Sequence, residues 1–444
     1  MDLINRNSKE MDMSRHQSNG QGWRRGRGGL GVALAGAFLL LAGCDGLLDV
    51  DLPGQVEARE LNDPRLAETL VLGVQADFEC GFSHYVFGTG LHADELDSVS
   101  TLRNFNIWGS RNDEQRNFGA DGCEALGSVA VWRPLQTARF QADETIRRIM
   151  EFPQDQIDMN KDLLVGWSHA YAGYSIVLLS EAFCSVTFDI GPEETRAQGF
   201  QRAENRFTQA IQSLEGINTQ EAESLRNMAL VGRARARLNL GDTGGAVMDA
   251  AQVPLDFVRY STHSTTSDRR RNRVHRISNV NRNLSVNARF RGLEVGGAPD
   301  PRVSYVDAGV GTDGFSGLFL QQKYASEADD KPIATGREAL LIIAEAEGGQ
   351  IAVDIINQLR ATHDLPTFSS SDPLEIMVQV MDERRRELWL QGTRMGDMLR
   401  FSSEVLDAAD LNWEMGLNNK LEPFGSNTCL PLMRAETDNN PNLG

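Results

Sequence analysis

The stretch STLRNFNIWGSRN, residues 100–112, gathers side chains that could bind a polar, ring-shaped ligand. A sugar presents apolar C–H faces and hydroxyl edges, so its site needs a flat aromatic ring with planar polar groups at the margin. This segment supplies both kinds, and we predict ligand contacts from five of its residues: Arg103, Asn104, Asn106, Trp108 and Arg111. A packed core position is an equally good interpretation of Trp108.

Catalytic chemistry has no comparable signature in the sequence. The chain contains no H-E-x-x-H, no G-x-S-x-G, no Walker loop and no G-x-G-x-x-G. His92, Asp94 and Asp97 form one close set, but three such residues on a loop more often make a turn than a metal site. Acidic residues are abundant, so counting them does not exclude a glycosidase pair. We therefore predict a protein that is not an enzyme and uses no cofactor or metal.

Cys44 marks a different chemistry, at the end of the uncharged run 30–41 that follows Arg24, Arg25 and Arg27. Twelve helical residues span about 18 Å, well short of the roughly 30 Å hydrocarbon core of a membrane. The residues Leu41-Ala42-Gly43-Cys44 look like a bacterial lipobox, in which the cysteine is acylated after cleavage. We expect a signal peptide over 1–43, lipid on Cys44 and a tether over 44–56. The alternative is an ordinary secretory signal with an incidental cysteine.

The charge and the remaining cysteines describe the body behind that tether. The whole chain carries −18, and the leader holds six basic and three acidic residues, so the part after it carries −21. This excess argues against nucleic acid and against docking on anionic lipid, so membrane attachment must come from the lipid. Four cysteines remain, which allows two disulfides in three pairings in an oxidising compartment. We favour Cys80–Cys123 and Cys184–Cys429.

Helical periodicity dominates the elements that must position these residues. Apolar residues between 162 and 181 form one stripe of an amphipathic helix. Segments 232–250 and 338–361 read as helix–turn–helix pairs with glycine at the corner, similar to tetratricopeptide hairpins. We predict a mainly α domain over 57–444, with a tetratricopeptide-like helical hairpin scaffold at about 160–254 and 335–400. Long irregular loop insertions are expected at about 80–133 and 255–325. An ordinary all-α domain with glycine turns is the alternative.

The segment MDERRRELWLQGTRMGDMLRF, residues 381–401, is the most specific motif in the chain. Pairs such as Asp382–Arg386, and Glu383–Arg386 or Arg384–Glu387, have the spacing of helical ion pairs. Gly392 permits a close or left-handed backbone, and an arginine fork can tie a second element by paired hydrogen bonds. We interpret this motif as structural rather than functional.

Together with LHADEL (91–96), DPRV (300–303), EALLIIAEAE (338–347) and the C-terminal CLPLMRAETDNNPNLG, that motif resembles the SusD/RagB family of outer-membrane lipoproteins. The resemblance implies a SusD-like fold, no catalysis, and a lipid-anchored position in the outer membrane facing the exterior. It also implies capture of a nutrient, such as an oligosaccharide or peptide, for a SusC-like TonB-dependent transporter. Family members contact ligand from N-terminal loops and the central insertion. An exported glycan hydrolase and a helical envelope scaffold without a ligand are the alternatives.

Overall fold

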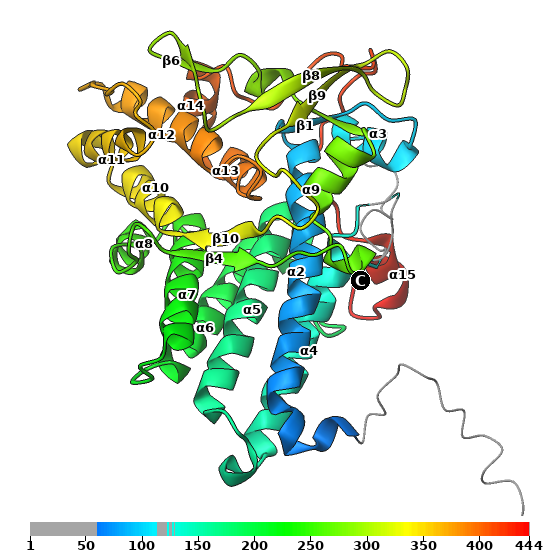
Figure 1. Ribbon diagram of the computed structural model, residues 1–444, viewed down its shortest axis with the longest axis vertical. Coiled ribbons are helices and arrows are strands. Elements are labelled where there is room, and N and C mark those ends of the chain that lie inside the picture. The colour runs from blue at the N-terminus through cyan, green and yellow to red at the C-terminus, as the bar shows by residue number, and fades with distance from the viewer. Residues whose placement is uncertain (1–59, 113–121, 124–126, 128, 444) are drawn as a thin grey trace, which may run out of the picture. The chain divides into compact units, whose positions relative to one another are not determined.

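Long helices packed side by side form the base of the fold in this computed structural model (Figure 1). The structure describes residues 60–112, 122–123, 127 and 129–443. The predicted signal peptide, Cys44 and the tether lie outside these residues. Contacts group Ala58–Gly444 into one compact unit. The base consists of α2 (Ala67–His92), α4 (Trp132–Glu151), α5 (Lys161–Ala182), α6 (Arg196–Ser213), α7 (Gln220–Asn239) and α8 (Thr243–Ala250).

Helix α5 is the centre of this base. Every residue from Leu163 to Ala182 is buried. Among the described helices it has the length and apolar composition of a membrane span, and its burial inside the protein accounts for that composition. Phe207 of α6 lies where glycines leave room for it: a Cβ on Gly173 would come within 2.6 Å of its ring, and one on Gly232 within 2.3 Å. The small residues therefore set how closely α5, α6 and α7 approach.

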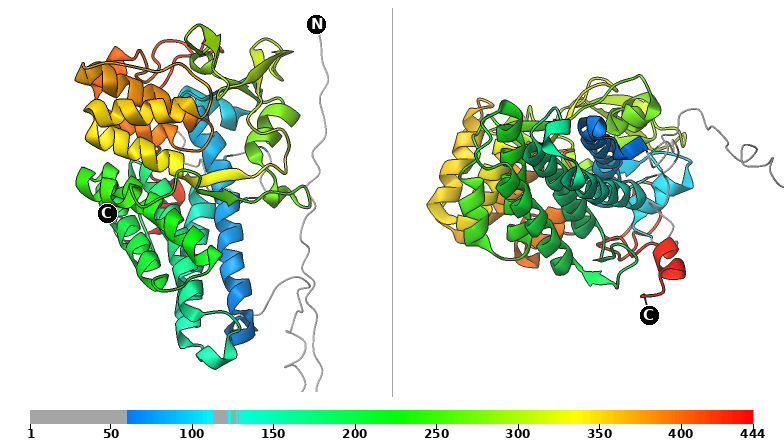
Figure 2. Two further views of the ribbon diagram at one scale, coloured as in Figure 1. Left: turned by 60° about the vertical axis from the view of Figure 1, so that its left-hand side comes forward. Right: turned by 90° about the horizontal axis from the view of Figure 1, so that it is seen from below.

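A second helical group lies at one end of the long helices, as both Figure 1 and the left view of Figure 2 show. It has its own apolar core, in which Leu341, Ile356 and Val380 are fully buried. Its helices are α10 (Gly336–Glu347), α11 (Gly349–Ala361), α12 (Pro373–Glu387), α13 (Arg394–Arg400) and α14 (Ser403–Ala408). With the base it confirms the predicted mainly α, hairpin-built fold.

Glycine turns join the helical pairs where the sequence predicted them. Gly241, with φ of 78°, follows α7 before α8 begins. Gly348 and Gly349, with φ of 61° and 51°, separate α10 from α11. Because side chains disfavour this left-handed region, glycine is the residue that ends one helix and starts the next at low cost.

The predicted loop insertion at 80–133 is wrong at its start. Residues 80–92 form the second half of α2, and Arg103–Ser110 forms the short helix α3. The second half of α2 is buried on all sides, so it shows no stripe of apolar residues against a polar face. The helix therefore escaped a search for amphipathic periodicity.

The insertion at 255–325 consists of short strands and helical turns joined by loops, and strand pairs attach it to the helices. β4 (Val258–Ser261) pairs antiparallel with β10 (Lys331–Thr335), which leads directly into α10. β5 (Leu284–Val286) pairs with β1 (Leu96–Ser98), with Leu96 opposite Val286. The hairpin of β8 (Tyr305–Val310) and β9 (Gly317–Gln321) completes the insertion. The central insertion thus lies against the segment that follows α2.

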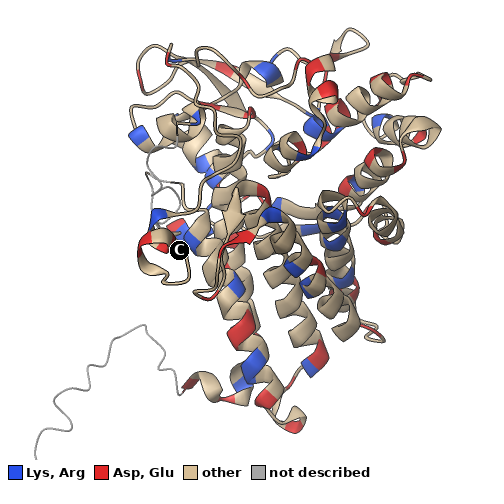
Figure 3. Cartoon of the chain, turned by 180° about the vertical axis from the view of Figure 1, so that it is seen from behind, with Lys and Arg blue, Asp and Glu red and all other residues tan. Residues whose placement is uncertain are grey.

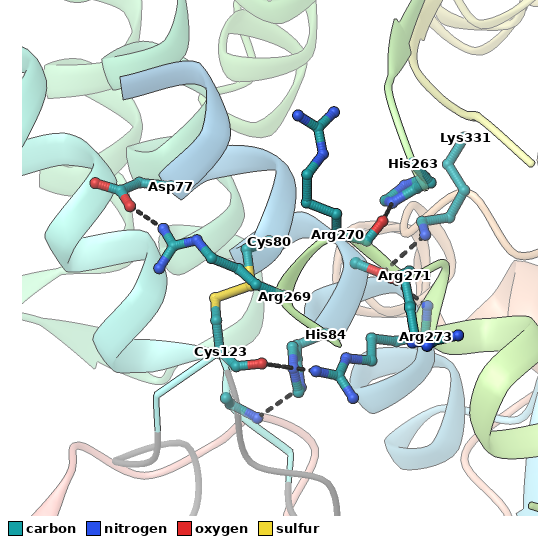
Figure 4. Close-up of a disulfide and its surroundings, with 12 residues drawn as sticks. Asp77, Cys80, His84, Cys123, His263, Arg269, Arg270, Arg271, Arg273 and Lys331 are labelled. Atoms are coloured by element: carbon teal, nitrogen blue, oxygen red, sulfur yellow. Dashed lines mark hydrogen bonds and ion pairs between the residues drawn. A yellow bond between two sulfur atoms is a disulfide. The ribbon is translucent and has the colours of Figure 1, made fainter. Parts of the chain in front are cut away.

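Both favoured disulfides are present. Cys80 is bonded to Cys123 and Cys184 to Cys429, with Cα–Cα distances of 5.9 and 5.1 Å. Figure 4 shows the first bond beside the basic run 268–276. In this run, Arg269 pairs with Asp77 of α2, and the buried Arg273 donates to the carbonyl of Cys123 at 2.8 Å. The run is therefore tied to α2 by one ion pair and to the disulfide segment by one hydrogen bond.

The motif at 381–401 is a buried ion-pair network that joins distant segments. Arg394 donates from Nε and Nη2 to the two carboxylate oxygens of Asp94, both at 2.7 Å. Burial opposes ionisation of Asp94, but Arg394 outweighs it and lowers the pKa of that carboxyl. Arg384 pairs in the same way with Asp397, at 3.1 and 2.7 Å. These contacts support the structural interpretation.

The local pairs predicted within the motif are formed only in part. Asp382 pairs with Arg386 at 2.8 Å, as expected for an i,i+4 contact. Glu383 instead accepts from Arg302 and Arg360, at 2.5 and 2.6 Å, because the helix face that carries it packs against those segments. Tertiary partners replaced the neighbours that helical spacing alone would select.

Candidate functional site

Three loops meet beside the β8–β9 hairpin and form an exposed surface that we call the loop face: residues 98–104, 311–317 and 413–424. Lys420 ties the three together. Its Nζ donates to the carbonyl of Ser100 at 2.7 Å and to Oδ2 of Asp313 at 2.8 Å. Asn419 adds a bond from Nδ2 to the carbonyl of Ser98 at 2.8 Å. Segments more than 100 residues apart are therefore held in one surface.

Asp313 shapes the turn between β8 and β9. Its Oδ1 accepts the N–H groups of Phe315 at 3.1 Å and Ser316 at 3.0 Å, and its own N–H donates to the carbonyl of Val99 at 3.1 Å. Burial opposes ionisation here, but the hydrogen bonds from Lys420 and Ser316 outweigh it and lower the pKa of Asp313 to about 2. The carboxylate is thus charged at any physiological pH, and it fixes the backbone that carries Phe315.

Phe315 is the aromatic platform of the loop face. Its side chain is 63% exposed, although phenylalanine is usually buried. The Lys420 ammonium lies 5.5 Å from the centre of its ring, within the range of a cation–π contact. Further exposed apolar side chains lie in the same loops: Leu102, Met415, Leu417 and Leu421. Several exposed large apolar side chains in one group of loops are typical of surfaces that bind a partner or ligand.

Three of the five predicted ligand residues lie on the outer part of α3, next to these loops. Arg103 is exposed. Asn104 donates from Nδ2 to the carbonyl of Gly127 at 3.4 Å, and Oδ1 of Asn106 accepts from the Ser98 hydroxyl at 2.6 Å. Their planar polar groups stand at the margin of the loop face, and ligand contact by them stays a prediction.

The other two predicted residues are buried. Trp108 is 1% exposed and belongs to the apolar core, which agrees with the packed interpretation. Arg111 is 2% exposed, and its guanidinium lies 5.4 Å from the ring of Trp413 and 5.0 Å from that of Phe424. It supports the 413–424 loop from below, so it stabilises the face rather than forming its surface.

Phe315 was missed by the sequence reasoning. It lies in GTDGFSG, residues 311–317, inside the loop insertion predicted at about 255–325. A phenylalanine between glycines, in a segment without apolar periodicity, has no core to enter, and that was the available signal. The exposed aromatic ring next to the predicted residues therefore belongs to the central insertion, whereas Trp108 is buried.

Carboxyl groups cluster beneath the 413–424 loop. Asn287 donates from Nδ2 to Oδ1 of Asp97 at 2.7 Å and to Oε2 of Glu414 at 3.3 Å. Burial raises the pKa of Asp97 to about 6. Burial, together with the charges of Asp97 and Asp94, raises the pKa of Glu414 to about 7. The cluster therefore holds protons near neutral pH.

The set of His92, Asp94 and Asp97 does not converge on a common point. Asp94 is bound to Arg394, and the buried His92 ring lies 6.3 Å from Trp108 and 6.0 Å from Trp413. In the described part of the chain, no three His, Cys, Asp or Glu side chains are arranged to hold a metal ion. These residues act in packing and turn formation.

Comparison with known proteins agrees with this architecture. Residues 337–444 match the model of the SusD family. A SusD superfamily protein from Parabacteroides distasonis superposes with a TM-score of 0.62 at 13% identity, covering 88% of this chain and 99% of that one. A SusD-like carbohydrate-binding protein from Bacteroides vulgatus gives 0.60 at 14% identity, covering 75% and 82%. No curated protein sequence matches the chain. The family match covers the C-terminal end, residues 337–444, and the solved SusD-like structures share the fold along most of the chain, which agrees with the resemblance of the sequence motifs.

Proposed function

We propose that this protein captures an oligosaccharide at the cell surface and delivers it to a TonB-dependent outer-membrane transporter. The observation that carries the proposal is the exposed ring of Phe315, held by Asp313 and Lys420 within a polar margin. Such a ring can stack on the C–H face of a sugar while side chains such as Arg103 and Asn104 reach its hydroxyls. A structurally similar protein, that of Bacteroides vulgatus, is a carbohydrate-binding protein, which supports the ligand class.

Calorimetric titration of the purified lipoprotein in detergent with a panel of oligosaccharides tests the capture step. We expect Phe315→Ala to weaken the binding of the preferred glycan by about tenfold, the loss expected when a ring contact is removed. The matched control is Met150→Ala, which shortens an exposed apolar side chain of α4 outside the loop face. Equal affinity of the Phe315 variant and the unchanged protein would contradict a ligand site at this face.

The delivery step requires a partner in the same membrane. The exposed Leu417 and Leu421 belong to the loop face, as Phe315 does, and they supply apolar surface for a barrel rim. We expect the protein to co-purify from outer membranes with a TonB-dependent barrel and Leu417→Asp/Leu421→Asp to abolish this association. Met248→Asp, at an exposed position on α8, is the control. Recovery of the wild-type protein without any barrel would count against delivery.

Attachment to the membrane depends on Cys44. We expect mass spectrometry to find an acylated cysteine at the mature N-terminus, and protease treatment of intact cells to degrade the domain. An unmodified cysteine with release of the chain into the medium would contradict the lipoprotein assignment. Binding at the surface without catalysis fits this arrangement, since a shared membrane raises the effective concentration of the two partners.

One observation favours a second function, the hydrolysis of a glycan. Asp97 and Glu414 share Asn287 and have raised pKa values, and a glycosidase needs one carboxyl that stays protonated. This function predicts turnover of the bound oligosaccharide and its loss in Glu414→Gln. Intact glycan after prolonged incubation with the purified protein would exclude it.

A further inference from the structure

A groove with a volume of about 740 Å³ lies apart from the loop face, between α4, the segment after β2 (Ser185–Val186) and the C-terminal segment that enters α15 (Arg434–Asn439). The right view of Figure 2 shows α15 at the edge of the helical base. The groove shares no lining residue with the loop face. Its size is within the range of about 300–1,000 Å³ usual for small-molecule sites.

The walls of the groove are fixed to one another by hydrogen bonds. Trp132 of α4 donates from Nε1 to Oε1 of Glu436 in α15 at 3.0 Å. Gln136 of α4 donates from Nε2 to the carbonyl of Thr187 at 2.7 Å. The disulfide between Cys184 and Cys429 joins the other two walls. A concavity held in this way exists before any ligand arrives, so little ordering is needed on binding.

An unusual backbone conformation lies at the rim. Asp189 and Ile190 have φ of 53° and 60°, a region that β-branched residues rarely adopt. The C-terminal segment stabilises this turn, since Asn442 donates to the carbonyl of Ile190 at 2.7 Å and Asn440 to that of Gly191 at 2.8 Å. The result is an isoleucine side chain that is 63% exposed beside the groove. Backbone strain maintained by distant residues is concentrated at functional sites.

Arg139 contributes a buried donor that has no protein partner. Its side chain lines the groove, is 5% exposed as a residue, and bonds through Nη1 to Asp189 and Asp143 at 2.8 and 3.1 Å. Within the described part of the chain, its Nε has no hydrogen-bond partner. A buried N–H without an acceptor is unfavourable, so this arginine at the groove wall keeps a hydrogen-bonding capacity that the protein does not use.

The chemistry of the lining selects the class of ligand. The two arginines, Arg133 and Arg139, are balanced by the carboxylates of Asp189 and Glu436, so the groove favours a neutral molecule over an ion. Phe140 is 48% exposed and offers a ring face. The hydroxyl and amide groups around it belong to Gln136, Thr137 and Gln141. A ring face with planar polar groups at its margin suits the C–H faces and hydroxyls of a sugar.

We propose that this groove is a second carbohydrate site, which binds a neutral oligosaccharide through Phe140, Arg139 and the polar side chains around them. Two sites on one chain hold a polymer at two points, and the second contact is then intramolecular. In this respect the inference rests on the proposed function, since it assigns the same class of ligand to both sites.

Calorimetric titration of the full-length lipoprotein in detergent separates the two sites. The probes are neutral linear tetrasaccharides of glucose, mannose and xylose, with tetrapeptides of uncharged residues as the competing class. The test variants are Phe140→Ala, which removes the ring, and Thr137→Trp, which fills the groove from an exposed position. Met150→Ala is the matched control, because Met150 is exposed on the same helix and does not line the groove. Unfolding curves confirm that the variants fold.

In the Phe315→Ala background, we expect the remaining tetrasaccharide affinity to fall about tenfold or more with either groove variant and to be unchanged by Met150→Ala. Binding that Phe315→Ala abolishes and the groove variants leave intact would overturn the second site while leaving the proposed function in place. A loss of tetrasaccharide affinity that the groove variants cause and Phe315→Ala does not would support a carbohydrate site in the groove and overturn the one at the loop face. A preference of the groove for the tetrapeptides, or no tetrasaccharide binding at all, would overturn the carbohydrate assignment.

Discussion

The arginine motif at 381–401 and the loop face use charged side chains in opposite ways. In the motif, guanidinium and carboxylate groups pair with each other, as Arg394 and Asp94 do, and both residues are buried. In the loop face, the side chains of the Lys420–Asp313 ion pair are buried, and the neighbouring ring of Phe315 is exposed. The motif is the richer in charge, yet its groups are buried where a ligand cannot reach them. The comparison teaches that exposed groups, and not the density of charge, indicate a binding surface.

Figure 3 extends the comparison to the helices, where basic and acidic residues lie near one another instead of forming patches of one sign. Arg147 of α4, for example, contacts Glu144 and Glu151, both at 3.0 Å, with half of its side chain exposed. Such pairs are screened by water and contribute little to stability. Three classes of charge can therefore be distinguished by experiment: buried pairs, pairs that support the loop face, and surface pairs.

The largest expected effect comes from breaking a buried pair of the motif. Asp94→Ala leaves the Arg394 guanidinium buried without its carboxylate, which should lower the free energy of unfolding by about 3–5 kcal/mol. Urea unfolding followed by tryptophan fluorescence measures this loss. A loss below about 1 kcal/mol, typical of an exposed pair, would mean that the motif is not structural.

Removal of a disulfide tests whether covalent links add to the network. The bond between Cys184 and Cys429 spans 245 residues of sequence, so it strongly restricts the unfolded chain. We expect the double variant Cys184→Ser/Cys429→Ser to lose about 2–5 kcal/mol in the same unfolding assay. If the double variant and the oxidised protein had equal free energies of unfolding, the packing of the helices would account for the stability without this disulfide.

Glu414 of the loop face differs from the carboxylates paired in the motif in how it should make stability depend on pH. The folded-state pKa of Glu414 is raised to about 7, mainly by burial and by the nearby charge of Asp97. A carboxyl whose pKa is higher in the folded state than in the unfolded state contributes fully to stability below the unfolded-state pKa. This contribution is lost as the pH rises toward the folded-state pKa of about 7. When the pH is raised from 5 to 8, the free energy of unfolding of the unchanged protein should fall by about 2 kcal/mol more than that of Glu414→Gln. Parallel stability curves for the two proteins would contradict the assignment.

Phe315→Ala should affect binding and leave the fold intact. Because the ring is exposed, we expect its removal to change the free energy of unfolding by at most about 0.5 kcal/mol while glycan affinity falls about tenfold. Urea unfolding and calorimetric titration of the same preparation measure the two quantities. A large loss of stability would make Phe315 part of the scaffold, like Trp108.

The smallest effect is expected at the surface pair of α4. Arg147→Ala should leave the free energy of unfolding nearly unchanged, since solvent screens both of its contacts. It serves as the matched control for Asp94→Ala, as each variant removes one partner of an ion pair. If Arg147→Ala lowered the free energy of unfolding as much as Asp94→Ala does, the distinction between buried and exposed ion pairs would be wrong.

Much of the fold could be predicted from the sequence, because amphipathic helices and glycine turns are local features. The turns at Gly241 and Gly348 were placed correctly, since a left-handed backbone after a helix requires glycine. The buried half of α2 was taken for a loop, because a helix surrounded by protein has no polar face to reveal its period. The candidate site could be predicted only in part. Arg103, Asn104 and Asn106 lie beside the loop face, but the exposed ring of that face, Phe315, is more than 200 residues away from Arg103 along the chain.

The sequence by itself determined the helical scaffold, the excess of negative charge, the family motif and the cysteines that pair. These properties follow from composition and from spacing along the chain. Only the tertiary structure decided that Trp108 is buried while Phe315 is exposed, and that Glu383 meets Arg302 rather than its neighbour Arg386. Burial and partner choice depend on which distant segments meet, and no local pattern records that encounter.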